Sequence, residues 1–116
     1  MIESLVAHLF HLRELAHRAH LRETSYARHM ALGDFYGTIG DHADAIAEAH
    51  MGRTGTMLEA IPFVIDQPSG SIVNDITAQR DWIDANRGAN APEIENLIDE
   101  ALATIDSALY KLKFLV

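Results

Sequence analysis

The feature that most constrains the fold is the spacing of apolar residues, which recur at intervals of four and three along most of the chain. Between residue 2 and about residue 21, the apolar positions with this spacing are Leu5, Leu9, Leu12, Ala16 and Ala19. A second run extends from residue 26 to residue 51, with apolar positions at Leu32, Phe35, Ile39, Ala43 and Ile46. Steps of four and three return a side chain to the same face of a helix. Both runs therefore predict long helices with one buried face.

Turn-forming residues mark the ends of these two helices. Glu23-Thr24-Ser25 interrupts the pattern between the first two runs and supplies N-cap residues for the second. The glycines of residues 52–55 end the second helix, and Pro62 and Pro68 prevent one regular helix across residues 56–70. We expect this stretch to be a long connection.

Two further helices are predicted after this connection. Ser71 is the expected cap of a third helix that stops near Gly88. Asn90, followed by Pro92 and Glu93, has the arrangement of a capping box, and the four-three spacing then continues to the C-terminus. No strand-like alternation competes with these assignments. The chain is therefore predicted to be all-α, a single domain over residues 1–116.

The lengths of the connections predict the topology. Short turns join helix one to helix two and helix three to helix four, whereas the link between helices two and three is long. Each short turn makes an antiparallel helix pair, and a long link between the pairs acts as a crossover loop. This is the connectivity of a ferritin-like four-helix bundle.

The composition limits the classes of partner. Nine Lys and Arg against 17 Asp and Glu give a net charge of −8, which argues against nucleic-acid binding by the monomer. The absence of cysteine excludes disulfides and thiolate metal sites. The N-terminal residues do not resemble a signal peptide, and no apolar run approaches the ~18 residues of a membrane span. We therefore expect a soluble, cytoplasmic protein that does not enter a membrane.

The chain is rich in histidine, and its seven histidines are interleaved with carboxylates in the first two helices. His8, His11, His42 and His50 are interpreted as solvated or hydrogen-bonded residues. His29, Asp44 and Glu48 follow one side of helix two, beside its apolar face. Imidazole and carboxylate together are ligands that suit iron, manganese or zinc.

Three glycines lie on this same side of helix two. Gly33, Gly37 and Gly40 each cost about 1 kcal/mol relative to alanine inside a helix, so their spacing indicates close approach of another element. Since the apolar face of this helix already has a core to fill, we predict a twofold homodimer through helix two.

An antiparallel pairing of this kind would bring ligands together from two copies. Asp44 and Glu48 of one chain would lie near His29 of the other, with His17 and His20 just across the first turn. Partly buried carboxylates at such a boundary repel one another unless a cation or proton offsets their charge. The sequence therefore predicts a metal site shared between subunits.

The residues around this site resemble a known family. The stretch Ala19-His20-Leu21, then Ser25 to Leu32, Phe35-Tyr36, Asp44 and Ala47-Glu48 is similar to the first helical hairpin of Dps-type miniferritins. It resembles more closely still the short phage-encoded ferritin-like proteins related to them. If the chain is phage-encoded, the expected location is the host cytoplasm.

The resemblance implies a ligand set. His29, Asp44 and Glu48 match the family pattern without a gap, and the ligand from the first helix is His17 by miniferritin spacing or His20 by the shorter turn of the phage proteins. His20 is favoured because the surrounding residues agree better. The family aspartate four residues after the second histidine is Gly33 here, so Asp34 is the candidate substitute.

The resemblance also implies a function. It implies a dimer-interface site that captures Fe(II), with ferroxidase activity toward peroxide or dioxygen, and Zn or Mn as other ions suited to the same ligands. The basic DNA-holding extension of the family has no counterpart, and the shell of many subunits is an open alternative to the dimer. The alternative function is a ferritin-like helical dimer without metal chemistry that serves as an interaction or structural module.

Overall fold

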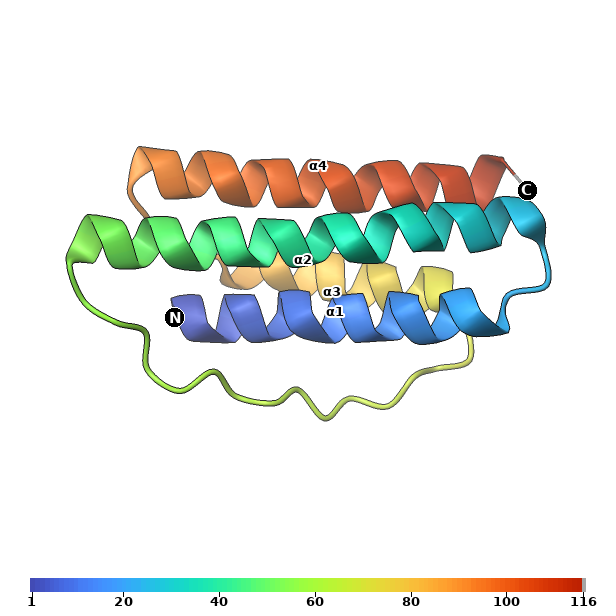
Figure 1. Cartoon of the computed structure of the whole chain (residues 1–116), viewed down its shortest axis with the longest axis horizontal. Helices are drawn as coiled ribbons and strands as arrows, with labels where there is room; N and C mark the ends of the chain where they lie inside the picture. Colours follow the sequence, from blue (N-terminus) through green and yellow to red (C-terminus); the bar gives the residue numbers. More distant parts are fainter. Residues whose placement is uncertain (116) are drawn as a thin grey trace.

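The computed structural model describes residues 1–115 as a bundle of four helices. These are α1 (Ile2–Arg22), α2 (Tyr26–Thr54), α3 (Ile72–Asn86) and α4 (Pro92–Phe114). No β-strand occurs in this part of the chain, so the predicted all-α class and the four helices are confirmed. Figure 1 shows α1 and α2 lying antiparallel and a long segment that runs back along the bundle to the start of α3. The α3 and α4 helices form a second antiparallel pair.

The predicted caps of α2 and α3 are present. The Ser25 hydroxyl accepts a hydrogen bond from the Arg28 backbone N–H at 3.4 Å, and the Ser71 hydroxyl accepts one from the Asn74 backbone N–H at 3.2 Å. At the other end of α2, Gly55 has a φ of 69°, the left-handed conformation that glycine adopts at low cost. These local signals explain why the helix ends were predictable.

The start of α4 differs from the prediction. The N-cap is Ala91, which makes no side-chain cap, and Pro92 occupies the first turn as expected. The Asn90 side chain instead donates to the Arg87 carbonyl and to the Glu95 carboxylate, both within 2.8 Å. The predicted capping box with Asn90 as the N-cap is therefore wrong. The Asn90 amide is bonded to Arg87 and Glu95, and the N-cap is the next residue, Ala91.

Every helix contributes to one core. In this core α1 packs on α2 and α3, and α4 packs on α2 and α3, so the diagonals of the bundle are α1 with α4 and α2 with α3. Its largest fully buried side chains are Leu5, Leu9, Leu12, Leu32, Ile39, Ile46, Ile76, Ile83, Ile94, Ile98, Ile105 and Leu112. Their four-three spacing is the periodicity that predicted the helices.

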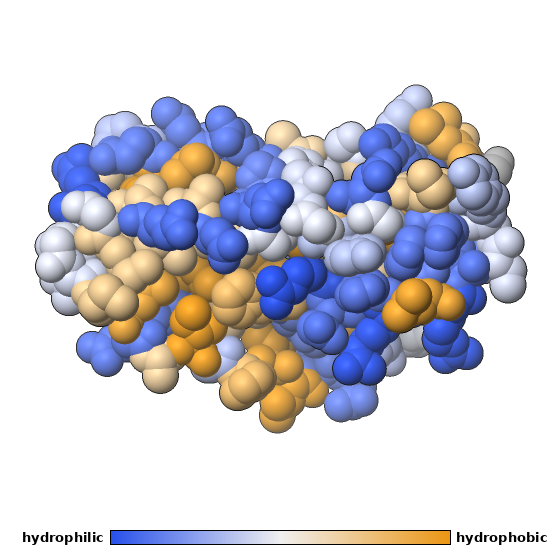
Figure 2. Space-filling view, viewed as in Figure 1, coloured by the Kyte–Doolittle hydropathy of each residue, from blue (hydrophilic) through white to orange (hydrophobic). Residues whose placement is uncertain are grey.

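The crossover segment of residues 56–71 is the least covered part of the molecule. Phe63 and Ile65 expose 94% and 83% of their surface, and Met57 exposes 79%. Figure 2 shows apolar side chains gathered over this segment and the neighbouring half of α1, while the other half of this face is mostly hydrophilic. Among the described helices, none combines the length and the apolar character needed to cross a bilayer.

Candidate metal centre

Three of the predicted ligands lie together at the α1–α2 turn. His17 and His20 come from the last turns of α1, and His29 comes from the first turn of α2. The rings of His20 and His29 stack with their centroids 3.7 Å apart and an interplanar angle of 20°. The His17 ring lies 6.3 Å from that of His20. All three side chains are half-buried.

His20 and His29 hold each other in place through reciprocal hydrogen bonds. The His20 Nδ1 lies 2.7 Å from the His29 carbonyl oxygen, and the His29 Nδ1 lies 2.8 Å from the His20 carbonyl oxygen. A carbonyl only accepts, so each Nδ1 must carry the proton and donate. In the neutral imidazole this leaves each Nε2 with a free lone pair. Metal-binding histidines commonly have this arrangement, in which the ring nitrogen that does not bind is hydrogen-bonded to a carbonyl.

Tyr36 extends the cluster along α2. Its ring stacks on His17 with centroids 4.0 Å apart and an interplanar angle of 7°, and it lies 5.5 Å from His20. Trp82 lies on α3 and stacks on His8, so the aromatic side chain that contacts the histidines of the α1–α2 turn is Tyr36.

Two glycines of α2 lie against side chains from α1 of the same chain. A Cβ on Gly33 would lie 3.0 Å from the His20 Cε1, and a Cβ on Gly40 would lie 3.3 Å from the Arg13 Cδ. Gly37 has no such neighbour within 4 Å. Two of the three glycines in the predicted dimer seam thus have an in-chain reason. The homodimer itself stays a prediction, with Gly37 as the open position.

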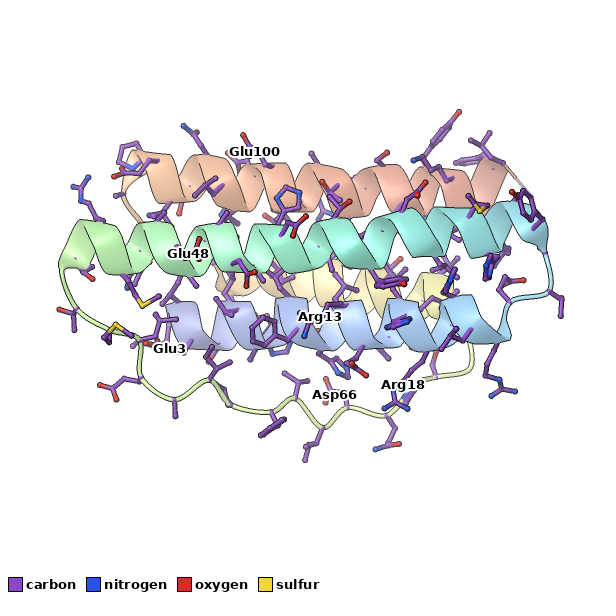
Figure 3. All side chains as sticks on the ribbon, viewed as in Figure 1. Glu3, Arg13, Arg18, Glu48, Asp66 and Glu100 are labelled. Atoms are coloured by element: carbon purple, nitrogen blue, oxygen red, sulfur yellow. The ribbon has the colours of Figure 1, made fainter. Side chains whose placement is uncertain are left out.

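The predicted carboxylate ligands lie away from the histidines. Asp44 and Glu48 are exposed on α2, 15 and 19 residues after His29, which is about 22 and 28 Å along a helix. Figure 3 shows Glu48 on the half of α2 far from the α1–α2 turn. Asp34 is exposed as well. Within residues 1–115, none of these three carboxylates makes a side-chain hydrogen bond or an ion pair.

One copy of the chain does not assemble a complete metal site. Among the described residues, no three His, Asp or Glu side chains are grouped to hold an ion. The stacking of His20 on His29 gives a physical reason, because the lone pair of an imidazole nitrogen lies in the ring plane. Lone pairs in two nearly parallel planes do not meet at one point. The His20 and His29 rings therefore carry two fixed nitrogen lone pairs that do not converge on one point.

The remaining histidines serve structural contacts where the structure shows one. The His8 Nδ1 lies 2.7 Å from the Gln79 Oε1, and the His42 Nε2 lies 2.8 Å from the Thr104 hydroxyl. These bonds join α1 to α3 and α2 to α4. They agree with the expectation that these histidines are hydrogen-bonded residues.

Residues 20–112 match a sequence family described as a family of unknown function, DUF5856. The chain belongs to the DUF5856 family. The DUF5856 match begins at His20 and includes His29, Asp44 and Glu48, whereas His17 lies before it. No curated protein and no solved structure matches the chain.

The reciprocal bonding of His20 and His29 was not predicted from the sequence. A signal for it was present, because two residues that flank a short turn symmetrically come to face each other in an antiparallel hairpin. Ser25, the N-cap of α2, follows the end of α1 by only three residues, so His20 and His29 occupy such positions. The sequence did not predict that each ring would donate to a backbone carbonyl, because that contact depends on the orientation of the ring.

Proposed function

We propose that this protein is a ferritin-like metal-binding protein whose site is completed by a second copy of the chain. His20 and His29 of one copy would provide imidazole nitrogens, and Asp44 and Glu48 of the other would provide carboxylate oxygens. Iron is the ion proposed first, and zinc and manganese suit the same ligands. His17 and Asp34 are the two further candidate ligands of this site.

The observation that carries this proposal is the pair of fixed imidazoles. Each Nδ1 is bound to a backbone carbonyl, so the Nε2 atoms have free lone pairs in ordered positions. The same bonds fix the Nδ1–H tautomer of both rings before the ion arrives, and the ring planes must then turn for both Nε2 atoms to reach one ion. The ring of His20 also fills the space over Gly33, which favours His20 over His17 as the α1 ligand.

The positions of the carboxylates support a shared site. Asp44 and Glu48 are exposed and stand one helical turn apart, so both can face the same neighbour. In an antiparallel pair of α2 helices, the separation of about 22 Å from His29 becomes the distance between two equivalent sites. The order of the helices and the crossover segment are consistent with the ferritin-like connectivity that we propose for the fold.

Bound Fe(II) would supply the redox chemistry, in which each ion gives one electron to peroxide or dioxygen. The role of the chain is to bind and orient the ion. Since the stacked rings do not aim at one point, an ion held by both requires the stack to open. With Zn(II) as a diamagnetic probe ion, loss of the ring-current shifts of His20 and His29 in proton NMR spectra is therefore the expected signature of binding.

The test uses two variants that damage opposite halves of the site. Metal-free protein is mixed anaerobically with Fe(II), peroxide is added, and ferric absorbance is followed for wild type, His29→Gln and Glu48→Gln. Each variant alone should lose protein-dependent oxidation. An equal mixture that has exchanged subunits should recover about a quarter of wild-type activity, because half of the dimers then contain one intact site of two.

Glu100→Gln is the matched control, because Glu100 is an exposed acid on α4 with no assigned role. Its oxidation rate should equal that of wild type. No recovery in the exchanged mixture would overturn the shared site. Wild-type oxidation equal to a protein-free blank, together with no metal bound after dialysis, would overturn the metal function and leave the helical interaction module.

A further inference from the structure

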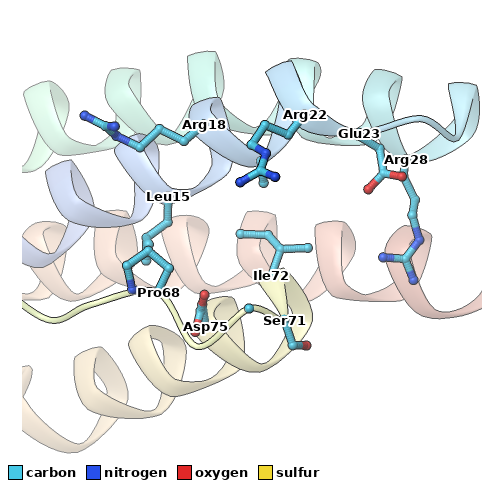
Figure 4. Close-up of a pocket in the computed structure, with 11 residues that line it drawn as sticks. Leu15, Arg18, Arg22, Glu23, Arg28, Pro68, Ser71, Ile72 and Asp75 are labelled. Carbon is cyan, nitrogen blue, oxygen red and sulfur yellow. The ribbon is translucent and has the colours of Figure 1, made fainter.

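An open groove lies at the end of the bundle that contains the α1–α2 turn. Its volume is about 820 Å³, within the range of small-molecule pockets. The groove exists because α3 has 15 residues and α1 has 21, so part of α1 has no partner on this side. Figure 4 shows the last turns of α1 above the groove, and Pro68, Ser71 and Ile72 below it.

Arginines from two helices line this groove. Arg18 and Arg22 stand one turn apart on α1, and Arg28 comes from the first turn of α2. In Figure 4 the Arg22 side chain extends into the groove toward Ile72. Arg18 pairs with the exposed Glu14 at 3.1 Å, and Arg28 donates to the Leu112 carbonyl at 3.1 Å. Within residues 1–115, Arg22 makes neither an ion pair nor a side-chain hydrogen bond.

The two carboxylates at the groove are already engaged. Both oxygens of Asp75 accept from the Ser69 backbone N–H, at 3.1 and 3.2 Å, and Glu23 accepts from the Ser25 backbone N–H at 3.1 Å. A carboxylate keeps its charge when it accepts from a backbone amide, so Glu23, Asp75 and the Glu14 partner of Arg18 balance the three guanidinium groups. Arg22 is the arginine that extends into the groove and, within residues 1–115, has no ion pair of its own.

Basic residues are concentrated at the end of the molecule that contains the groove. Five of the nine basic residues lie at this end, in the ranges 14–30, 68–75 and 108–115, but only three of the 17 acidic residues do. The five are Arg18, Arg22, Arg28, Lys111 and Lys113. In a chain with a net charge of −8, such a separation creates a local field that attracts anions to one end.

We propose that this groove binds a small organic phosphate, a phosphate monoester that carries an apolar group. Guanidinium groups match phosphate oxygens in geometry and form charge-assisted hydrogen bonds with them. Leu15, Ala19, Pro68 and Ile72 line the same groove and provide an apolar wall for the rest of the ligand. The N-terminus of α3 opens on the groove, and its partial positive charge adds to the attraction.

Isothermal titration calorimetry at low salt, with a metal chelator present, tests the site independently of the metal proposal. The probe is phenyl phosphate, compared with inorganic phosphate and with phenol. We expect phenyl phosphate to bind to one site per chain, more tightly than inorganic phosphate, and phenol not to bind. Arg22→Gln should weaken phenyl phosphate binding about tenfold or more, as expected for the loss of a charge-assisted hydrogen bond.

Arg53→Gln is the matched control, because Arg53 is exposed at the other end of α2 and, within residues 1–115, pairs with Glu93 alone. It should bind phenyl phosphate as the wild type does. Ala19→Glu places a carboxylate in the groove at a helical position and should abolish binding, with circular dichroism confirming the fold. Binding that is unchanged in Arg22→Gln, or absent in wild type at millimolar phenyl phosphate, overturns the site. Equal affinity for inorganic phosphate overturns the apolar part of the ligand.

Discussion

Gly33 and His20 show how one missing side chain fixes the position of another. The His20 ring occupies the space that a Cβ on residue 33 would need, and from there it reaches both the His29 ring and the His29 carbonyl. The absence of a carboxylate at position 33 is thus coupled to an ordered imidazole. Position 33 therefore provides space for the His20 ring in place of a side chain of its own.

Gly33→Ala should therefore destabilise the protein although alanine favours helices. The new Cβ would press on the His20 ring and break its bond to His29, at a cost of about 1 kcal/mol. Gly52→Ala is the control, because within residues 1–115 no side chain and no other element lies within 4 Å of its Cβ position. It should stabilise by up to about 0.5 kcal/mol. Urea unfolding measures both, and equal stabilisation of the two variants would show that the His20 ring yields freely.

His11 gives a pH-dependent contribution at the scale of one residue. Its pKa is lowered from the ordinary value mainly because burial disfavours the imidazolium, and nearby His8 lowers it further against the opposing effects of Asp66, Asp75 and Glu14. The unfolded chain therefore binds more protons at this position as the pH falls below about 6.5. This contribution to stability is present above that pH and is lost below it.

His11→Gln removes that titration. Between about pH 7.5 and about pH 5.5, the unfolding free energy of wild type should fall more than that of the variant. Urea unfolding of both proteins at the two pH values gives the comparison. A constant difference between wild type and variant would mean that His11 titrates alike in the folded and unfolded chains.

The corner between α3 and α4 shows how elements are joined without a long loop. Arg87 follows α3, and its Nη2 lies 2.7 Å from the Asp99 carboxylate and 3.1 Å from the Glu95 carbonyl. Only 19% of its side chain is exposed. Asn90 adds a second set of bonds within the same turn. The side chains of Arg87 and Asn90 thus fix the angle between α3 and α4.

Replacing Arg87 by alanine should cost about 1.5–3 kcal/mol, because charged hydrogen bonds are lost and a backbone carbonyl loses its donor. Arg53→Ala provides the comparison. Its ion pair with Glu93 is more than half exposed on both sides, so water screens it and its loss should cost much less than that of Arg87. Thermal unfolding followed by circular dichroism distinguishes the two. Similar losses would assign the corner to backbone geometry rather than to Arg87.

The helices were predictable because their signals are local. The spacing of leucines and isoleucines, Ser25 and Ser71 at helix starts, and Gly55 at a helix end all act within a few residues. The partners of Asn90 were not predictable, because they depend on where Arg87 and Glu95 come to lie in space. The same holds for the candidate site, whose residues were chosen from the sequence but whose ring orientations depend on the α1–α2 packing.

At the scale of the whole molecule, the proposed metal site depends on pairing with a second copy of the chain. Gly37 is the seam position without an in-chain neighbour, so a large side chain there would meet the partner first. Gly37→Leu should yield monomers in light scattering, whereas Ala103→Leu on the exposed face of α4 should not. A dimer that persists in Gly37→Leu would place the interface elsewhere.

The crossover segment separates the synthesis of α1 and α2 from that of the two helices that complete the bundle. The α1–α2 hairpin is complete once residue 54 has been synthesised, but α4, which covers one side of α2, ends only at residue 114. At roughly 5–20 residues per second, the ribosome takes several seconds to supply that cover. During this interval the side of α2 that α4 covers in the complete bundle is open to solvent.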